Sequence, residues 1–167
     1  MRLEKVRFPL KVLLVILLAA PALFAASPIV RPGAVWRDNR GQTIQAHGGG
    51  VVRWKGVYYW FGEDRKQSND PAKRYVACYS SKDLVHWKFR HDVLVLSDPE
   101  HLGAKWVLER PKVFPNPHTG KFVMYAHLDN SSYKVARVAV AVSDRIDGNY
   151  RYVKSFRPLG QESRDIG

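Results

Sequence analysis

Cysteine is nearly absent from this sequence: Cys78 is the only one among 167 residues. A chain with a single cysteine forms no internal disulfide, so its core depends on packing alone. Cys78 lies in the apolar run Tyr75–Tyr79, where no nearby group would lower the pKa of its thiol. We therefore predict that Cys78 packs as a small buried hydrophobic residue and is not a catalytic nucleophile.

Metal and phosphate motifs are also missing. The six histidines show no HExxH or comparable ligand spacing, which excludes the common zinc motifs. The run Gly48–Gly50 precedes an expected strand rather than a helix, so it does not have the context of a phosphate-binding loop. Three glycines instead allow the backbone to pass close to a ligand or a central pore. The sequence therefore implies no metal and no cofactor.

Acidic residues are scarce relative to basic ones. The chain has 27 Lys and Arg against 15 Asp and Glu, which gives a formal net charge of +12. Such an excess favours anionic partners. The basic residues are spread singly along the chain rather than gathered in a stripe, so we expect no nucleic-acid partner. We interpret the charge as a source of solubility, and of affinity for an acidic glycan or envelope surface.

The sequence has one long apolar run, and it lies near the start. Basic residues precede the run 12–20, and Pro21 and several small residues follow it. This order is typical of a secretory signal peptide, which we place at residues 1–26. A membrane anchor is the alternative, but a spanning helix needs about 20 apolar residues, and Pro21 interrupts this run. We therefore expect a secreted or periplasmic protein with no stable membrane span after cleavage.

Helical periodicity is absent from residues 27–167, where short apolar or aromatic runs alternate with turn residues. The runs within about 44–96 predict four antiparallel strands, and those within about 107–158 predict four more. Two four-stranded meanders in tandem are typical of β-propeller blades, and residues 161–167 would then start a third blade. An isolated two-sheet sandwich is the alternative. The predicted fold class is all-β in either case.

The two groups of strands can be aligned as repeats. Val57–Phe61 aligns with Phe122–Ala126, and Val76–Ser80 aligns with Val138–Val142, at offsets of about 62 to 65 residues. In the first group, Trp87–Arg90 starts the fourth strand, and Val93–Leu96 continues its extended structure. The alignment predicts that residues at matching positions of the two groups have matching places in the fold.

Polar side chains lie where the predicted strands begin and end. In a propeller the innermost strand of each blade starts near the central axis, so residues at equivalent starts converge. The residues at these three starts are Gln45 and His47, then Glu109 and Arg110, then Ser163, Arg164 and Asp165. Glu63 and His127 end the second strands of their groups at matching places. Carboxylates bind hydroxyl groups and serve as acid or base, so this set predicts a sugar site.

Five motifs in this order resemble glycoside hydrolase family 43, and within it the exo-β-1,3-galactanase (galactan 1,3-β-galactosidase) group. The resemblance extends from Trp36 to Gly167. The motifs are Gln45–Gly50, Tyr58–Glu63, Glu109–Val113, His127–Asn130 with Tyr133, and Ser163–Asp165. The resemblance implies a five-bladed β-propeller, of which this chain would hold about two blades and the start of a third. It also implies inverting hydrolysis of β-1,3-galactan or an arabinogalactan-type polysaccharide.

The resemblance also implies roles for individual residues. Glu63, Glu109 and Tyr133 match positions that bind the terminal galactose. Asp165 matches the carboxylate that holds the general acid in place and tunes its pKa. The family's usual aspartate base would fall near His47 and is absent. In the galactanase group a later glutamine takes that role, so we expect the acid and base to lie beyond this chain. Gln45, His47 and Arg110 are expected to shape the pocket.

Alternatives to this interpretation come from the same residues. A module of this ancestry without catalysis would bind carbohydrate only, and a pair of meanders could instead expose sheet edges to a partner chain. Glu109 beside Arg110 could form a structural ion pair, and Glu63 could be a solvated strand end. His47 and His127 are expected to support or pack the site rather than to act as ligands. The sequence predicts no particular oligomeric state.

Overall fold

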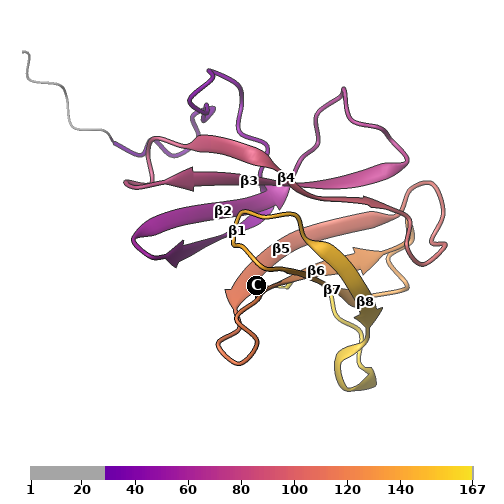
Figure 1. Ribbon diagram of the computed structural model, residues 1–167. Coiled ribbons are helices and arrows are strands. Elements are labelled where there is room, and N and C mark those ends of the chain that lie inside the picture. Colours follow the sequence, from indigo (N-terminus) through magenta and orange to yellow (C-terminus); the bar gives the residue numbers. More distant parts are fainter. Residues whose placement is uncertain (1–28, 167) are drawn as a thin grey trace, which may run out of the picture.

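The computed structural model describes residues 29–166, so the predicted signal peptide at residues 1–26 lies outside the described residues. The first sheet contains β1 His47–Trp54, β2 Val57–Glu63, β3 Lys73–Ser81 and β4 Lys88–Ser97. The second sheet contains β5 Val107–Pro115, β6 Phe122–Asp129, β7 Arg137–Ser143 and β8 Arg151–Phe156. Figure 1 shows the two sheets as two stacked layers. A short 3₁₀ helix, η1 Pro158–Gly160, follows. Within 29–166, no helix has the length and apolar character needed to span a bilayer.

Each sheet is an antiparallel meander, with strand orders β1-β2-β3-β4 and β5-β6-β7-β8. The prediction of two four-stranded meanders is therefore confirmed. One detail of it is wrong: strand β1 begins at His47, so Gly48–Gly50 lie inside the strand rather than before it. The continuous fourth strand is confirmed as β4, residues 88–97, and bulges in its pairing with β3 absorb its irregular apolar pattern.

A continuous apolar core fills the space between the two sheets. Sheet one contributes Phe61, Val76 and Cys78, which are fully buried, and sheet two contributes Met124 and Ala139, which are at most 4% exposed. Burial of each large side chain contributes roughly 1.5–3 kcal/mol, so this core is the main link between the sheets. Strand β5 lies against both β1 and β2. The predicted burial of the single cysteine is confirmed.

The opposite face of sheet one is covered by residues 29–46, which we call the lead-in segment. The rings of Trp36 and Trp60 meet edge to face, with centroids 5.7 Å apart. Ala46 crosses directly over β2 at Gly62, where a side-chain Cβ would lie 2.2 Å from the Ala46 carbonyl carbon. The glycine is therefore required for close approach of two backbones, and the lead-in segment is an integral layer of the fold.

The first strand of each sheet carries a β-bulge at the same place. In both sheets a cross-strand pair of an acid and a histidine precedes the bulge, and regular pairing resumes three residues later. The flanking pairs are His47↔Glu63 and Gly50↔Phe61 in sheet one, and Glu109↔His127 and Lys112↔Tyr125 in sheet two. The first bulged residue has left-handed backbone in each, with φ of 55° at Gly48 and 53° at Arg110. The two sheets are therefore structural repeats down to this local distortion.

These pairs correct the predicted alignment of the second strands. Phe61 occupies the position of Tyr125, whereas the sequence alignment matched it with Ala126. A shift of one residue along a strand moves every side chain to the other face. The alignment of Val76 with Val138 is confirmed, because these residues pair with Glu63 and His127 at the equivalent strand ends.

The far face of sheet two is the face that points away from sheet one. It carries the residues equivalent to those on the core face of sheet one. Val123, Tyr125 and Val140 share this face with Phe114 and Phe156 through cross-strand pairs. Phe114 is 53% exposed and Phe156 is 37% exposed. Among residues 29–166 no segment covers this face in the way that sheet two covers sheet one.

The contact between Gly62 and the lead-in segment can be tested by Gly62→Ala. We expect this change to lower the free energy of unfolding by about 2 kcal/mol or more, because the added methyl group displaces backbone. Gly33→Ala is the matched control: Gly33 has φ of 78° and open space around its Cβ position, so its cost is only about 1 kcal/mol of backbone strain. Urea denaturation measures both. Equal costs would show that the lead-in segment does not pack on β2.

Cys78 provides a second test of the core. Its side chain is fully buried, and burial raises the pKa of its thiol far above the usual range. We expect no reaction with Ellman's reagent in the folded chain at pH 8, and stoichiometric reaction in denaturant. Rapid labelling of the folded chain would contradict the packing of the two sheets.

Candidate functional site

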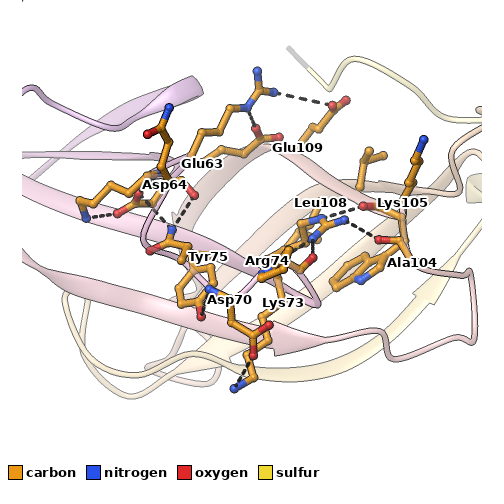
Figure 2. A pocket seen from close by; sticks show the side chains of 17 residues that line it. Glu63, Asp64, Asp70, Lys73, Arg74, Tyr75, Ala104, Lys105, Leu108 and Glu109 are labelled. Carbon is orange, nitrogen blue, oxygen red and sulfur yellow. Dashed lines mark hydrogen bonds and ion pairs between the residues drawn. The ribbon is translucent and has the colours of Figure 1, made fainter.

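A cleft of about 600 Å³ lies between the two sheets at one end of the molecule. One wall is the end of β2 with the loop that follows it, and the other is the connector into β5 with the start of that strand. Figure 2 shows Glu63 and Glu109 facing each other across one end of the cleft. At the other end, the Arg74 guanidinium donates to the carbonyls of Trp106 at 2.6 Å and Ala104 at 3.3 Å. This arginine therefore joins the two walls.

Arg65 links the two carboxylates at the narrow end of the cleft. Its Nε donates to Glu63 Oε2, and its terminal nitrogen lies 3.8 Å from Glu109 Oε1. The same Glu109 oxygen accepts a hydrogen bond of 2.9 Å from the Tyr133 hydroxyl. Residues from β2, β5 and two loops thus meet in one polar cluster.

Glu63 is the last residue of β2, and its side chain is only 12% exposed. Burial raises the pKa of Glu63 above its usual value, while the hydrogen bond and the positive charge from Arg65 oppose that rise. The neighbouring Glu109 carboxylate adds to it. A raised pKa in a carboxyl group next to a second carboxylate is typical of binding and catalytic sites.

Glu109 and Tyr133 are fixed by unusual backbone. Glu109 directly precedes the β5 bulge, which turns its side chain toward the end of β6. Tyr133 lies in the loop after β6 with φ of 55°, and its N–H donates to the carbonyl of Asn130. Burial raises the pKa of the Tyr133 phenol, and the hydrogen bond to Glu109 raises it further. The phenol therefore keeps its proton and donates it.

Behind Glu109 lies a buried pair formed by His127 and Asp129, both at the end of β6. The two side chains are at most 1% exposed, and His127 Nε2 lies 3.0 Å from Asp129 Oδ2. Burial acts to raise the pKa of Asp129, but hydrogen bonds from His127 and from the backbone outweigh it and hold the pKa below its usual value. The backbone donors include Val135, at 2.7 Å. Asp129 is therefore an ionised carboxylate at neutral pH.

Arg110 and Asp165 form a separate ion pair at the rim of the site. Arg110 Nε lies 2.5 Å from Asp165 Oδ1, and both side chains are substantially exposed. Arg164 holds the end of the chain in place, because its guanidinium donates to the Tyr133 carbonyl at 2.6 Å and 3.1 Å. The segment after η1 therefore folds back over the loop that carries Tyr133.

Gln45 and His47 form a third group on the side of β1. Gln45 Oε1 and His47 Nε2 are 3.0 Å apart, and the Gln45 N–H donates to the Tyr79 hydroxyl. Burial lowers the pKa of His47, and the positive charge of Arg65 lowers it further. His47 pairs with Glu63 in the β1–β2 ladder, so this group borders the polar cluster.

The structure thus places the predicted site residues in three adjacent groups. Glu63, Glu109 and Tyr133 meet through Arg65, while the ion pair of Arg110 with Asp165 and the pair Gln45–His47 flank them. Sequence reasoning missed Arg65, which was assigned to a polar loop. The acid–histidine pairing at both bulges could have drawn attention to His127 as a partner of Glu109. The bulges themselves have no sequence signal, because Arg110 is not a residue type that favours positive φ.

The arrangement can bind a polyhydroxylated ligand. Ionised carboxylates accept hydroxyl hydrogen bonds, and Arg65 and Tyr133 donate them. Among residues 29–166 there is no group of three or more His, Cys, Asp or Glu arranged to hold a metal ion.

Several solved enzyme structures share this fold and sequence. An exo-β-1,3-galactanase from Phanerochaete chrysosporium, solved with galactose, is 43% identical to this chain, covers 79% of it and superposes with a TM-score of 0.72. A family 43 β-1,3-galactosidase solved with galactodeoxynojirimycin is 47% identical over 75% of the chain, with a TM-score of 0.65. An exo-β-1,3-galactanase from Clostridium thermocellum is 45% identical over 76%, with a TM-score of 0.65. The chain belongs to glycoside hydrolase family 43.

This family 43 chain is much shorter than those relatives. It spans 31% of the length of the Phanerochaete enzyme, 37% of the galactosidase and 27% of the Clostridium enzyme. No protein-family model matches it, and a search of curated proteins finds no match. The assignment to family 43 therefore rests on the solved structures.

Arg65→Met tests the role of the arginine between the two carboxylates. Because the folded pKa of Glu63 is raised, its contribution to stability declines as pH rises from about 4.5 through the folded pKa. Removing the guanidinium raises that pKa further and leaves two carboxylates facing each other. We expect the variant to lose about 1–2 kcal/mol at pH 7.5 and much less at pH 4.5.

Urea denaturation at the two pH values measures this loss, with Arg151→Met on the exposed face of β8 as the matched control. A loss of the same size at both pH values would show that Arg65 contributes packing rather than charge.

Proposed function

We propose that this chain forms the galactose-binding part of a glycosidase that acts on β-1,3-galactan or an arabinogalactan-type polysaccharide with inversion of configuration. The observation that carries the proposal is the meeting of Glu63 and Glu109, from different sheets, at one end of a cleft. The likeness to an exo-β-1,3-galactanase solved with galactose supports this choice of sugar.

The cluster has the donors and acceptors that a terminal galactose requires. Glu63 and Glu109 would accept hydrogen bonds from adjacent sugar hydroxyl groups, and Arg65 would hold the two carboxylates at a fixed separation. Tyr133, which is 42% exposed, offers a phenol at the edge of the cluster. Charge-assisted hydrogen bonds are worth roughly 1.5–3 kcal/mol each, so two carboxylates can dominate the affinity for a monosaccharide.

Asp165 has the supporting role in this proposal. In family 43 a carboxylate at this position tunes the pKa of the general acid, and the ion pair with Arg110 would keep Asp165 oriented. An inverting reaction needs an acid and a base about 6.5–9.5 Å apart with a water molecule between them. We assign neither group to a residue of this chain, so we propose that both come from sequence beyond it.

We also propose that the two sheets are successive blades of a five-bladed β-propeller, with blade one at about residues 44–96, blade two at about 107–158 and the start of blade three at 161–167. The repeated bulge and the equivalence of Phe61 with Tyr125 support this proposal. The apolar far face of sheet two would receive the next blade. Export through the signal peptide at residues 1–26, to the periplasm or the exterior, would bring the protein to polysaccharide substrates.

Glu63→Gln and Glu109→Gln test the proposed sugar site. We expect each change to weaken galactose binding by about tenfold or more, because each removes a charge-assisted hydrogen bond. Asp144→Asn is the matched control, since Asp144 is exposed and pairs with Lys121 in the turns away from the cleft. Calorimetric titration of the whole chain with galactose measures the effect. Unchanged affinity in both glutamine variants would refute the site.

Assay of the same chain on β-1,3-galactan separates an enzyme from a carbohydrate-binding module. Binding without release of galactose is the outcome expected for the chain alone. Release of galactose would contradict the placement of the acid and base outside it.

A further inference from the structure

The ring of His127 has one nitrogen that the known contacts leave without a hydrogen-bond partner. Nδ1 is fully buried, and the group it faces is Glu109 Oε2, at 3.6 Å. That distance is too long for a hydrogen bond and short enough for a direct electrostatic contact. A buried polar atom without a partner is uncommon in folded proteins and calls for an explanation.

The other ring nitrogen, Nε2, carries a proton because of the group that it contacts. His127 Nε2 lies 3.0 Å from Asp129 Oδ2, and the pKa of Asp129 is held below its usual value by the hydrogen bonds that it accepts. An ionised carboxylate only accepts hydrogen bonds, so Nε2 must carry the proton and donate it. A neutral ring would then point the lone pair of Nδ1 at the Glu109 carboxylate, which is repulsive. The contact is attractive only when a proton lies between Nδ1 and Oε2.

The remaining contacts of Glu109 are on its other oxygen. Oε1 accepts the Tyr133 hydroxyl at 2.9 Å and lies 3.8 Å from Arg65, whereas Oε2 faces only the His127 ring among the contacts described. The ring of Tyr133 also rests on the ring of His127, with centroids 5.8 Å apart. The orientation of the carboxylate therefore depends on Tyr133 and Arg65 at one oxygen and on His127 at the other.

The strand geometry fixes this arrangement. His127 and Asp129 are two residues apart on β6, so their side chains leave the same face of the strand. Asp129 is anchored from behind, because its Oδ1 accepts the N–H groups of Asn130 and Val135. In sheet one the histidine of this pair, His47, is on the first strand and the acid, Glu63, is on the second. In sheet two the order is reversed, because Glu109 is on the first strand and His127 on the second. The fold repeat alone therefore does not dictate a histidine at position 127.

We propose that His127, anchored by Asp129, is a positioning residue whose Nδ1 proton faces Glu109 and holds its carboxylate by electrostatic attraction in the orientation that binds the sugar. This inference rests on the proposed role of Glu109 in binding galactose. His127 itself does not contact the sugar. The charged and titratable groups around His127 and Glu109 are Asp129 from β6, Tyr133 from the following loop, Arg65 from the loop after β2, at 3.8 Å from Glu109, and Arg164, at 4.0 Å from Asp129.

Two isosteric substitutions separate the two nitrogens of the ring. In His127→Asn the side-chain amide reaches the position of Nδ1 and can donate to Glu109. In His127→Gln the amide reaches the position of Nε2 and can donate only to Asp129. We expect His127→Gln to weaken galactose binding about tenfold or more, and His127→Asn to retain most of the wild-type affinity at pH 6. If His127 only packs, the two substitutions should weaken galactose binding equally. Alternatively, His127→Gln should weaken it less, because glutamine is the larger side chain.

The pH profile provides a readout that packing does not change. In the wild-type chain we expect affinity for galactose to fall as pH rises, because the electrostatic contact is lost with the proton on Nδ1. In His127→Asn this component is absent, since an amide keeps its N–H at every pH. Identical profiles for the two proteins would overturn the proposal. Protection of the Cys78 thiol shows that each variant is folded, and the comparison of wild type with His127→Asn decides the question even where His127→Gln does not fold.

Glu109→Gln distinguishes this inference from the function on which it rests. Unchanged galactose binding in Glu109→Gln would refute the sugar site itself. Loss of binding in Glu109→Gln together with full affinity in His127→Gln would refute only the role of His127.

Discussion

The packing of sheet one against sheet two is the interaction on which the rest of the structure depends. Phe61, Cys78 and Met124 bury the surface between the layers, and that contact brings β5 alongside β1 and β2. Glu63 and Glu109 are distant in the sequence and share a site only because of this contact. Arg65 and Arg74 span the same junction, so the arrangement of the polar groups of the cleft depends on this apolar interface.

Much of the architecture could be predicted from turn residues and apolar runs, but the register could not. Strand β2 reads Val-Tyr-Tyr-Trp-Phe, with large residues on both faces, because the lead-in segment covers one face and sheet two covers the other. Such a strand has no alternation of polar and apolar residues to fix its phase. The alignment of Phe61 with Ala126 was wrong by one residue for this reason. Strand β3, aligned through Val76 and Val138, was predicted in the correct phase.

Repetition predicted that the strand ends bearing Glu63, Glu109 and Tyr133 would converge, but it did not predict their partners. Arg65 lies in a loop of turn-forming residues, where nothing in the pattern distinguishes a bridging cation from a solvated one. His127 meets Glu109 because the two are cross-strand partners directly beside the bulge of β5, and Arg110 in that bulge is not a glycine, the residue type that would indicate left-handed backbone. Interactions that depend on such local distortions are determined by the tertiary fold and cannot be predicted from composition or residue spacing.

The lead-in segment has a consequence for self-association. Repetitive sheets with two equivalent faces can add copies end to end without limit, which is a route to filaments. Here one terminal face is occupied by Trp36 and its neighbours, while the other is the apolar far face of sheet two. The lead-in segment therefore leaves no second open sheet face on this side for another copy to extend. A segment that packs within one chain would in this way also oppose stacking between chains.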